Sequence, residues 1–410
     1  MKQKPISRRQ FPRVAELRPL LRPKLPRLTG VEDRLAAAAN VDDVKQLARR
    51  RAPRAVFDYV EGGAANEVSI GRSAEAFSRA EFEPRVLRDV SAVETGTSIL
   101  GREASMPVVL APTGFTRMMH RDGESGVTRA AAEAGVPYAL STMGTTSIEE
   151  LAAVSPATRR WFQLYLWQDR PRSMDLLRRA ADSGYEALIL TVDTPVAGPR
   201  LRDVRNGMTI PPALTGKTLV NGALHPRWWF DFLTSPPLEF ASVTEWAGTP
   251  AELSDTLLDP SVTIDDVHWL RKNWPGKLIV KGILGVADAE AIVDAGADAI
   301  VVSNHGGRQL DRSPVPLERL PAIAEALAGR AEIYVDGGVT NGADVAAAVC
   351  LGAQAVLVGR AYLYGVMAGG EHGVRRVTGI LRKELETTMR LLGCASVKEL
   401  SADRIRLRAV

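Results

Sequence analysis

The 410-residue sequence contains only two cysteines, five histidines and no long apolar run. Cys350 and Cys394 lie far apart in segments with helical patterns, which argues against a disulfide framework or a thiolate metal site and fits a reducing cytoplasm. No two histidines have the spacing of metal ligands, so we expect no metal. No window approaches the roughly 18 apolar residues of a membrane span. With 45% hydrophobic and 24% charged residues, the chain has the composition of a soluble globular protein.

Basic residues are concentrated at the N-terminus. The first 27 residues contain nine Lys or Arg and one acid, Glu16, whereas the whole chain carries a net charge of +4. We expect residues 1–40 to form a basic arm that either attracts anionic lipid or another polyanion, or is a solvated tail. SRRQF at 7–11 resembles a twin-arginine export signal, but no apolar run follows it, so we do not expect export. We predict no nucleic-acid partner.

From residue 108 onward, short apolar runs rich in β-branched residues alternate with segments of helical pattern. The runs predict strands at 108–114, 138–142, 161–166, 187–193, 278–282, 299–305, 333–338 and 355–361. Continuous apolar strands that alternate with helices are typical of a closed parallel barrel with its helices outside. We therefore predict an α/β fold, a TIM (β/α)8 barrel, within a domain over 41–402, followed by a C-terminal tail at 403–410.

Two additions to the barrel are expected. Residues 41–64 predict a helical extension broken at Pro53, and 373–394 predict a long closing helix. Between the fourth strand and its helix at 263–274, the interval is unusually long, which is typical of lids and binding elements. We therefore expect a lid or membrane-contact loop at 197–262.

Within that loop, HPRWWFDFLTSPP at 225–237 gathers four aromatic residues and a cation, namely Arg227, Trp228, Trp229, Phe230 and Phe232. Such a cluster is typical of a membrane-interface anchor. It is equally typical of a lid or a subunit interface packed over the barrel. Both interpretations stay open, with a slight preference for peripheral membrane contact.

Polar residues stand at the predicted carboxyl ends of the strands, where a barrel of this type builds its active site. They are Thr113, Ser141, Gln163, Tyr165, Thr191, Asp193, Lys281, Ser303, His305, Asp336 and Arg360. Any one of them could be a satisfied polar cap, but so many strands that bring such groups to one mouth indicate an active site. DGGVTNGAD at 336–344 and GRA at 359–361 add glycines and a cation after the last two strands, which predicts a bound phosphate.

The motifs SNHGGRQLD (303–311), FDYVEGGA (57–64), APTG (111–114), FQLY (162–165), TVDTP (191–195), VKGI (280–283), DGG (336–338) and GRAYLYG (359–365) recur in order on these strands. Together they resemble the FMN-dependent L-2-hydroxy-acid dehydrogenase and oxidase family over roughly 41–402. Within it, the pattern is most similar to bacterial respiratory L-lactate dehydrogenases, which pass electrons to the membrane quinone pool.

The resemblance implies FMN as cofactor and a role for each matching residue. Pro112, Thr113 and Gly114 would lie along the flavin, Ser141, Gln163, Thr191, Lys281 and Ser303 would hold its polar edge, and Asp336, Gly337, Gly338, Gly359 and Arg360 would hold ribityl and phosphate. Tyr59, Tyr165, Arg200 and Arg308 would bind substrate. His305 would be the base, oriented by Asp193.

These roles agree with the chemistry of the residue types. Arg308 and Arg200 can hold a carboxylate bidentately, and a histidine paired with a carboxylate can be a base near neutral pH. Lys281 would stabilise negative charge on the reduced flavin. The glycines after His305 would let the chain turn so that Arg308 reaches the same substrate. Whether His305 removes the α-proton or the hydroxyl proton is left open.

Three positions depart from the family pattern. Thr340 stands where many members carry an arginine that reaches the phosphate. Gly114 stands where alanine is common, beside the flavin's reactive edge, which leaves the choice between dehydrogenase and oxidase open. Met143 replaces an aromatic residue of some relatives, which suggests a different substrate side-chain pocket.

We therefore predict oxidation of L-lactate to pyruvate, with electrons passed to quinone or a cytochrome. The alternatives are an oxidase that makes peroxide from oxygen, and a member that acts on a larger or peptide substrate. A flavin-binding scaffold without turnover is disfavoured, because it needs neither a base nor two arginine clamps. The resemblance suggests a homotetramer. We expect a cytoplasmic protein, with peripheral contact to the inner face of the cell membrane.

Overall fold

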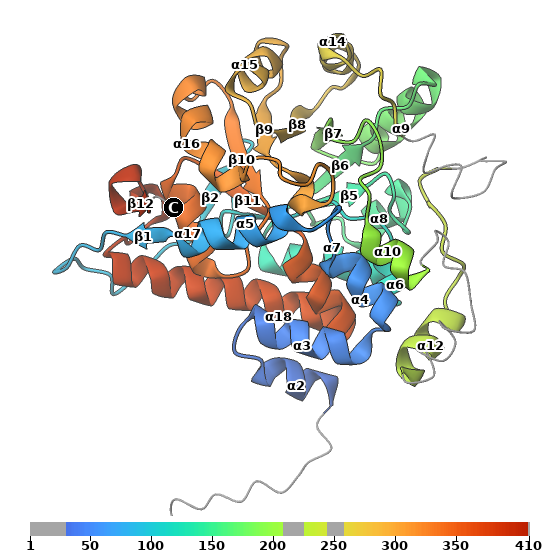
Figure 1. The fold of residues 1–410 in the computed structure, drawn as a ribbon, viewed down its shortest axis with the longest axis horizontal. Coiled ribbons are helices and arrows are strands. Elements are labelled where there is room, and N and C mark those ends of the chain that lie inside the picture. The colour runs from blue at the N-terminus through green and yellow to red at the C-terminus, as the bar shows by residue number, and fades with distance from the viewer. Residues whose placement is uncertain (1–29, 208–224, 244–257, 409–410) are drawn as a thin grey trace, which may run out of the picture.

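The computed structural model describes residues 30–207, 225–243 and 258–408, and its centre is a closed barrel of eight parallel strands (Figure 1). The strands are β4 (Val108–Leu110), β5 (Tyr138–Ser141), β6 (Arg160–Leu164), β7 (Ala187–Thr191), β8 (Lys277–Ile283), β9 (Ala299–Val302), β10 (Glu332–Asp336) and β11 (Ala355–Val358). They pair in chain order, and β11 closes the ring on β4 with Val356 beside Val108. The predicted TIM barrel is confirmed.

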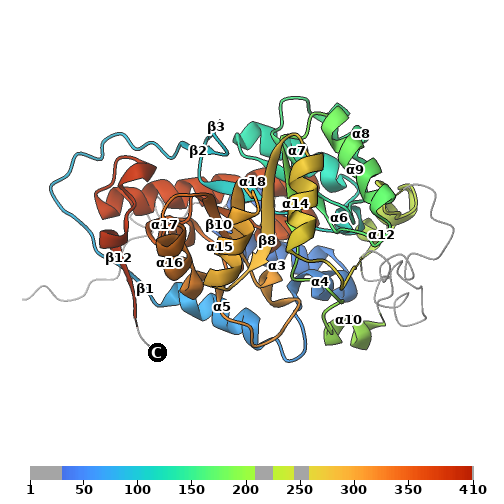
Figure 2. The same cartoon turned by 90° about the horizontal axis from the view of Figure 1, so that it is seen from above.

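A helix follows each barrel strand and lies outside the ring (Figure 2). These helices are α7 (Gly123–Ala134), α8 (Ile148–Val154), α9 (Arg170–Asp182), α14 (Ile264–Asn273), α15 (Val286–Asp294), α16 (Pro316–Leu327), α17 (Gly342–Cys350) and α18 (Arg360–Leu392). The long closing helix α18 starts directly after β11 and is kinked at Gly369 and Gly370, where the backbone leaves helical geometry.

Seven of the eight barrel strands end earlier than the apolar runs suggested, whereas β8 continues to Ile283. β4 ends at Leu110 rather than 114, because Pro112 has no N–H to continue a ladder. β9 ends at Val302, so the expectation that a strand ends on His305 was wrong. His305 has φ 56°, which is incompatible with an extended strand. Pro112 and His305 therefore lie on loops just above the barrel, whereas other predicted site residues lie on the strands themselves, namely Ser141, Gln163, Thr191, Lys281 and Asp336.

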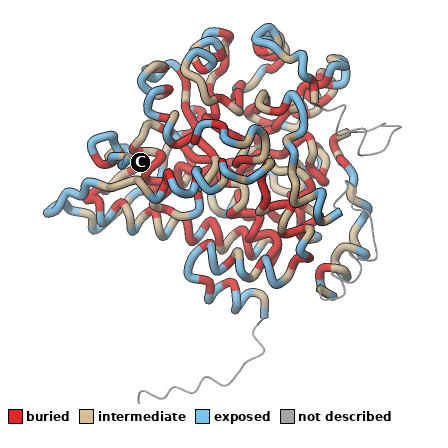
Figure 3. The backbone as a smooth tube through the Cα atoms, viewed as in Figure 1, coloured by how far each residue is buried: buried red, intermediate tan, exposed pale blue. Residues whose placement is uncertain are grey.

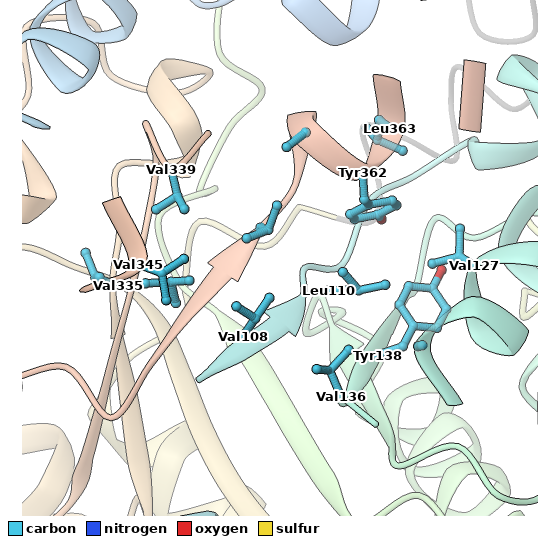
Figure 4. Packing of buried hydrophobic residues seen from close by; sticks show 14 of the residues in the cluster. Val108, Leu110, Val127, Val136, Tyr138, Val335, Val339, Val345, Tyr362 and Leu363 are labelled. Carbon is cyan, nitrogen blue, oxygen red and sulfur yellow. The ribbon is translucent and has the colours of Figure 1, made fainter. Parts of the chain in front are cut away.

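Side chains alternate between two cores along each barrel strand. In β4, Val109 belongs to a cluster inside the barrel, whereas Val108 and Leu110 belong to the cluster between strands and helices (Figure 4). Because both faces of each strand are packed against apolar side chains, the strands are buried along almost their whole length (Figure 3). Burying one such side chain contributes about 1.5–3 kcal/mol, so these two layers hold the mouth rigidly.

A small hairpin closes the opposite end of the barrel. It consists of β2 (Thr97–Ile99) and β3 (Arg102–Ala104). Ile99 and Leu100 belong to the same apolar cluster as the barrel interior, and Leu100 N–H donates to Glu332 Oε2 at the start of β10. The hairpin therefore seals the N-terminal end and leaves the carboxyl end for ligands.

The N-terminal extension consists of α2 (Val31–Ala37), α3 (Val41–Arg51), α4 (Arg54–Glu61) and α5 (Val68–Ser78), with α2 and α3 packed along α18 (Figure 1). The predicted break at Pro53 is confirmed.

The folded part is longer at both ends than the predicted domain over 41–402. α2 lies within the expected arm at 1–40, yet it belongs to the fold, since Leu35 is buried in the hydrophobic core. The expected tail contributes β12 (Ile405–Leu407), which pairs with β1 (Ala80–Phe82). Short 3-10 turns at Val397–Glu399 and Ala402–Arg404 lead into β12. Among the described residues, no helix has both the length and the apolar character to cross a bilayer.

Candidate active site

Three polar side chains form a hydrogen-bonded row across β5, β6 and β7. Ser141 Oγ donates to Gln163 Oε1 at 2.8 Å, and Gln163 Nε2 donates to Thr191 Oγ1 at 3.1 Å. All three residues are buried at the carboxyl end of their strands. The row fixes the orientation of the Gln163 amide, so this side of the mouth presents a defined set of donors and acceptors.

Lys281 on β8 lies beside this row and is also buried. Its Nζ donates to Ser303 Oγ at 2.9 Å and lies 3.1 Å from Asp336 Oδ2. Although burial acts in the opposite direction, the carboxylates of Asp336 and Asp193 raise the pKa of Lys281. The mouth therefore contains a permanent positive charge in a dry environment.

His305 and Asp193 form the second charged pair. His305 Nδ1 lies 3.0 Å from Asp193 Oδ1. A carboxylate only accepts hydrogen bonds, so the neutral ring carries its proton on Nδ1 and its lone pair on Nε2. Burial alone would raise the pKa of Asp193, but His305 and Lys281 outweigh it and lower that pKa. The pair therefore has the form of an oriented base.

The backbone around His305 is a tight turn, the 3-10 segment η1 (His305–Gly307). His305 and the two glycines after it have φ angles of 56, 61 and 74°, which glycine adopts at little cost. His305 N–H donates to Ser303 Oγ at 3.0 Å, and Gly307 N–H donates to Asn304 Oδ1 at 3.1 Å. The turn is thus held by the two residues that precede it.

Two further residues of the same motif were missed by the sequence interpretation. Gln309 Nε2 donates to the carbonyl of Asp193 at 3.0 Å, and its Oε1 accepts from Gly198 N–H at 3.0 Å. Asp311 Oδ1 accepts from Ser69 N–H at 2.9 Å. Both therefore fasten distant segments to the turn. The signal in the sequence was only their place in a largely polar segment, SNHGGRQLD, after an apolar run.

Two arginines, Arg308 and Arg200, converge on the ring of Tyr59. The Arg308 and Arg200 guanidinium carbons lie 5.1 and 5.6 Å from the centre of the Tyr59 ring. Arg308 also donates to the carbonyls of Tyr59 and Gly62. Burial and the neighbouring Arg200 lower the pKa of Arg308 to about 10. Two cations that raise each other's energy form a site that an anion would stabilise.

Tyr165 lies within the electrostatic reach of the same groups. Burial and the negative charge of Asp193 raise the pKa of Tyr165, so its hydroxyl stays protonated and can donate. The predicted substrate residues Tyr59, Tyr165, Arg200, Arg308 and His305 are therefore brought together around one space.

Unpartnered polar atoms test whether FMN fits this mouth. Among the residues that the structure describes, Asp336 Oδ1 and Asp193 Oδ2 are buried and find no hydrogen-bond partner, which is costly unless a ligand supplies a donor. The resemblance assigns Asp336 to the ribityl chain, whose hydroxyls are such donors. A methyl group at Gly359 would meet only Ala111 Cβ, at 3.8 Å, so there is space beside it. These residues fit FMN.

The phosphate end relies on Arg360. Its Nε donates to the carbonyl of Val60 and its Nη2 to that of Gly62, both at 3.0 Å, and its Nη1 has no acceptor within the described part of the chain. Gly337 and Gly338 have φ angles of 85 and 95° and let the backbone turn there. Thr340 is exposed and donates to Asp344 at the start of α17, so it adds no cation.

Thr113 is placed differently from the other predicted flavin residues. Its hydroxyl lies 2.5 Å from the hydroxyl of Tyr362 and 3.3 Å from that of Thr116. Tyr362 OH in turn donates to the carbonyl of Ala111. The Thr113 hydroxyl is therefore engaged within the protein, and a flavin contact here would come from the backbone of the loop with Pro112 and Gly114.

The aromatic cluster of the long loop is only partly exposed. It forms helix α12 (Pro226–Leu233), in which Trp228 is buried and donates from Nε1 to the carbonyl of Met118 at 2.9 Å. Phe230 and Leu233 are 65% and 69% exposed, and Arg227 is exposed as well. α12 thus both packs on the barrel and presents an apolar edge. Residues 1–29 of the predicted basic arm at 1–40 lie outside the described residues.

No group of three or more His, Cys, Asp or Glu side chains suited to a metal ion occurs in the part of the chain that the structure describes.

Comparison with known proteins gives one consistent result. The model of the family "FMN-dependent dehydrogenase" matches residues 48–407. A Mycobacterium tuberculosis protein named "Putative L-lactate dehydrogenase" is 53% identical over 393 residues, which cover 96% of this chain and 95% of that protein. The L-lactate dehydrogenase of Caulobacter vibrioides is 42% identical over 370 residues, 88% of this chain and 96% of its own length.

Solved structures agree with the sequence relatives. The crystal structure of a protein described as "monotopic membrane protein (S)-mandelate dehydrogenase" superposes with a TM-score of 0.86 at 36% identity, over 91% of this chain and 100% of that chain. Mandelate oxidase superposes with a TM-score of 0.80 at 40% identity, over 91% and 99%. The matches span nearly the whole barrel together with its extension, so this chain is an oxidoreductase that belongs to the FMN-dependent dehydrogenase family.

Proposed function

We propose that the protein oxidises an L-2-hydroxy acid, with L-lactate to pyruvate as the first choice. The observation that carries the proposal is the juxtaposition at one mouth of the His305–Asp193 pair with the arginines over Tyr59. An anionic substrate that must lose a proton needs a cation clamp and an oriented base. A scaffold without turnover needs neither.

In this proposal Arg308 and Arg200 bind the substrate carboxylate, which relieves their mutual repulsion. His305 Nε2 takes up a proton from the substrate, and Asp193 stabilises the resulting imidazolium charge across the 3.0 Å bond. FMN supplies the two-electron acceptor for the substrate α-carbon. Lys281 provides a fixed positive charge beside it. Whether the α-proton or the hydroxyl proton goes to His305 is left to experiment, because both routes use these residues.

The substrate side chain would lie against Gly114 and Met143. A methyl group at Gly114 would be only 3.0 Å from Met143 Cβ, so the two positions face each other closely. The relatives named as L-lactate dehydrogenases support a small side chain. The structural neighbours named for mandelate favour a larger one as the second candidate.

We propose quinone or a cytochrome as the electron acceptor, reached through peripheral membrane contact. The apolar edge of α12, with Phe230, Leu233 and Arg227, supports this contact, because apolar and cationic side chains together bind headgroup regions. The (S)-mandelate dehydrogenase neighbour, described as a monotopic membrane protein, points the same way. A homotetramer remains our expectation. The alternative is an oxidase that passes electrons to oxygen.

Anaerobic absorbance titration of the purified flavoprotein with L-lactate tests the reaction, with D-lactate as control. Bleaching of the flavin band by L-lactate alone is expected. Lack of bleaching by L-lactate, together with bleaching by a bulkier 2-hydroxy acid, would overturn the choice of lactate. Oxygen consumption during turnover then separates the oxidase from the dehydrogenase.

A further inference from the structure

Glu124 is a buried carboxylate that the proposed reaction does not use. It lies in the first turn of α7 and is 0% exposed. Its oxygens accept three hydrogen bonds, from Thr145 N–H at 2.8 Å, Thr145 Oγ1 at 2.6 Å and Thr146 Oγ1 at 3.1 Å. All three donors belong to one loop.

Burial makes the three hydrogen bonds of Glu124 important for the conformation of that loop. A carboxylate removed from water costs several kcal/mol unless hydrogen bonds compensate it. Here three donors and the positive end of the α7 dipole provide the compensation. Conversely, if Glu124 is replaced by an apolar side chain, the amide of Thr145 and the hydroxyls of both threonines lose their acceptor. The loop would then have to rearrange to satisfy them.

The loop at 142–147 joins two other segments of the mouth. Phe115 N–H donates to the carbonyl of Met143 at 3.1 Å, and Arg117 N–H donates to Thr145 Oγ1 at 3.2 Å. Ala241 N–H, from the segment after α12, donates to the carbonyl of Gly144 at 3.1 Å. Glu124 therefore holds the loop after β5, which in turn hydrogen-bonds to the loops after β4 and β7.

This loop also carries the side of the pocket opposite Gly114. Met143 N–H donates to Ser141 Oγ at 3.1 Å, which links the loop to the row with Gln163. The gap between Gly114 and Met143 leaves no room for a methyl group without movement, since that group would lie 3.0 Å from Met143 Cβ. A shift of the loop by a fraction of an ångström would therefore change the width of the pocket.

We propose that Glu124 is a positioning residue that fixes the Met143 wall and so restricts the size of the substrate side chain. This inference rests on the proposed oxidation of a 2-hydroxy acid at the same mouth. Glu124 touches neither substrate nor flavin in this proposal. It acts through Thr145 and the backbone of the loop.

The test uses the flavin-loaded full-length protein and pairs of matched variants. Glu124→Leu removes all three hydrogen bonds, whereas Glu124→Gln keeps an oxygen for the Thr145 amide and can donate to the hydroxyls. Thr145→Val removes one donor and Thr145→Ser keeps it. Thr158→Val is the control, because Thr158 is equally buried but bonds the carbonyl of Thr128, away from the mouth.

The measured quantity is the ratio of kcat/KM for L-lactate to that for (S)-mandelate. We expect Glu124→Leu and Thr145→Val to lower this ratio by about tenfold or more, the effect of changing an apolar pocket by a methylene-sized space. Glu124→Gln, Thr145→Ser and Thr158→Val should leave it within about twofold, although Thr158→Val loses thermal stability. An unchanged ratio in Glu124→Leu and Thr145→Val would overturn the proposal.

A second readout separates this inference from the proposed function. The visible circular dichroism of bound FMN reports the surroundings of the flavin without turnover. We expect it to change in Glu124→Leu and Thr145→Val and not in Thr158→Val. If no 2-hydroxy acid reduces the wild-type flavin, the proposed function fails, and the dichroism still decides whether Glu124 positions the mouth. Identical spectra in all variants would overturn that role.

Discussion

We expect Gly282→Ala to disable the His305–Asp193 pair without unfolding the barrel. Gly282 has φ 112°, and a methyl group there would lie 2.7 Å from Asp193 Cβ, 2.8 Å from its Cγ and 2.9 Å from its backbone nitrogen. Carbon atoms rest at about 3.5–4.0 Å, so the Asp193 side chain has to move by roughly 1 Å. That shift breaks the 3.0 Å bond to His305 Nδ1. A hydrogen bond to a charged group contributes about 1.5–3 kcal/mol, which corresponds to roughly 10- to 150-fold slower flavin reduction.

The assay is anaerobic stopped-flow reduction of the bound flavin by L-lactate, and Gly352→Ala is the matched control. Gly352 lies between α17 and β11 and has φ 109°. A methyl group there would lie 2.7 Å from Ala324 Cβ on α16. Both variants should lower Tm through backbone strain of about 1–3 kcal/mol, but only Gly282→Ala should slow reduction. Equal slowing in both, or normal reduction in Gly282→Ala, would refute the reasoning.

A double variant excludes an indirect effect through Lys281, which precedes Gly282 in the chain. Asp193→Asn should slow reduction about as much as Gly282→Ala, and the combination should be no slower than either, because both changes remove the same interaction. Additive losses would mean that Gly282 acts through a different group.

Four other outcomes are expected. His305→Gln should keep its yellow flavin and lose at least about 100-fold in reduction rate by L-lactate, the contribution of a general base; normal turnover would contradict the assignment. Oxalate, an anion without an α-hydrogen, should raise the free energy of unfolding by about 2.7 kcal/mol at a concentration 100-fold above its Kd, and so raise Tm. Arg308→Lys should reduce this increase in Tm, which thermal scans measure. Gly114→Ala should reduce kcat/KM for (S)-mandelate more than for L-lactate, by about tenfold, because its methyl group meets Met143; equal losses for both acids would argue against this wall. Folding lowers the pKa of Asp193 from 3.8, so its charge stabilises the fold above that pH, and this stabilisation is lost as pH falls through the lower pKa of the folded state. Asp193→Asn should therefore have a lower free energy of unfolding in urea than wild type at pH 7, and the difference between the two proteins should shrink by pH 3.

The barrel was predictable because its physical signal is local. Each strand is an apolar run buried on both faces, and each helix repeats its apolar positions along one side, so the order of elements can be recognised without tertiary information. The carboxyl ends were less predictable. Val302 and His305 are separated by only two residues, yet one ends a ladder and the other has φ 56°, a difference set by the turn rather than by hydrophobicity.

The charged groups of the site were predictable as candidates, because burying a lysine or an aspartate at a packed strand end is energetically unfavourable without a partner. Their supports were not. Nothing in the local sequence of Glu124 or Gln309 distinguishes them from solvent-facing residues of a helix and a loop, and their partners lie 21 and 116 residues away. Trp228 likewise appeared as one of four equivalent aromatics, although it alone of the four is buried.

The turn after β9 explains why so much of the site is encoded in one continuous motif. Ser303 Oγ accepts from both Lys281 Nζ and His305 N–H, so the cation at the flavin edge and the base share one anchor. Gln309 holds the backbone of Asp193, and Arg308 holds that of Tyr59. One nine-residue segment thereby fixes the base, its orienting carboxylate and the substrate clamp relative to one another. Substitutions within it should consequently be strongly non-additive, because each one disturbs a shared anchor.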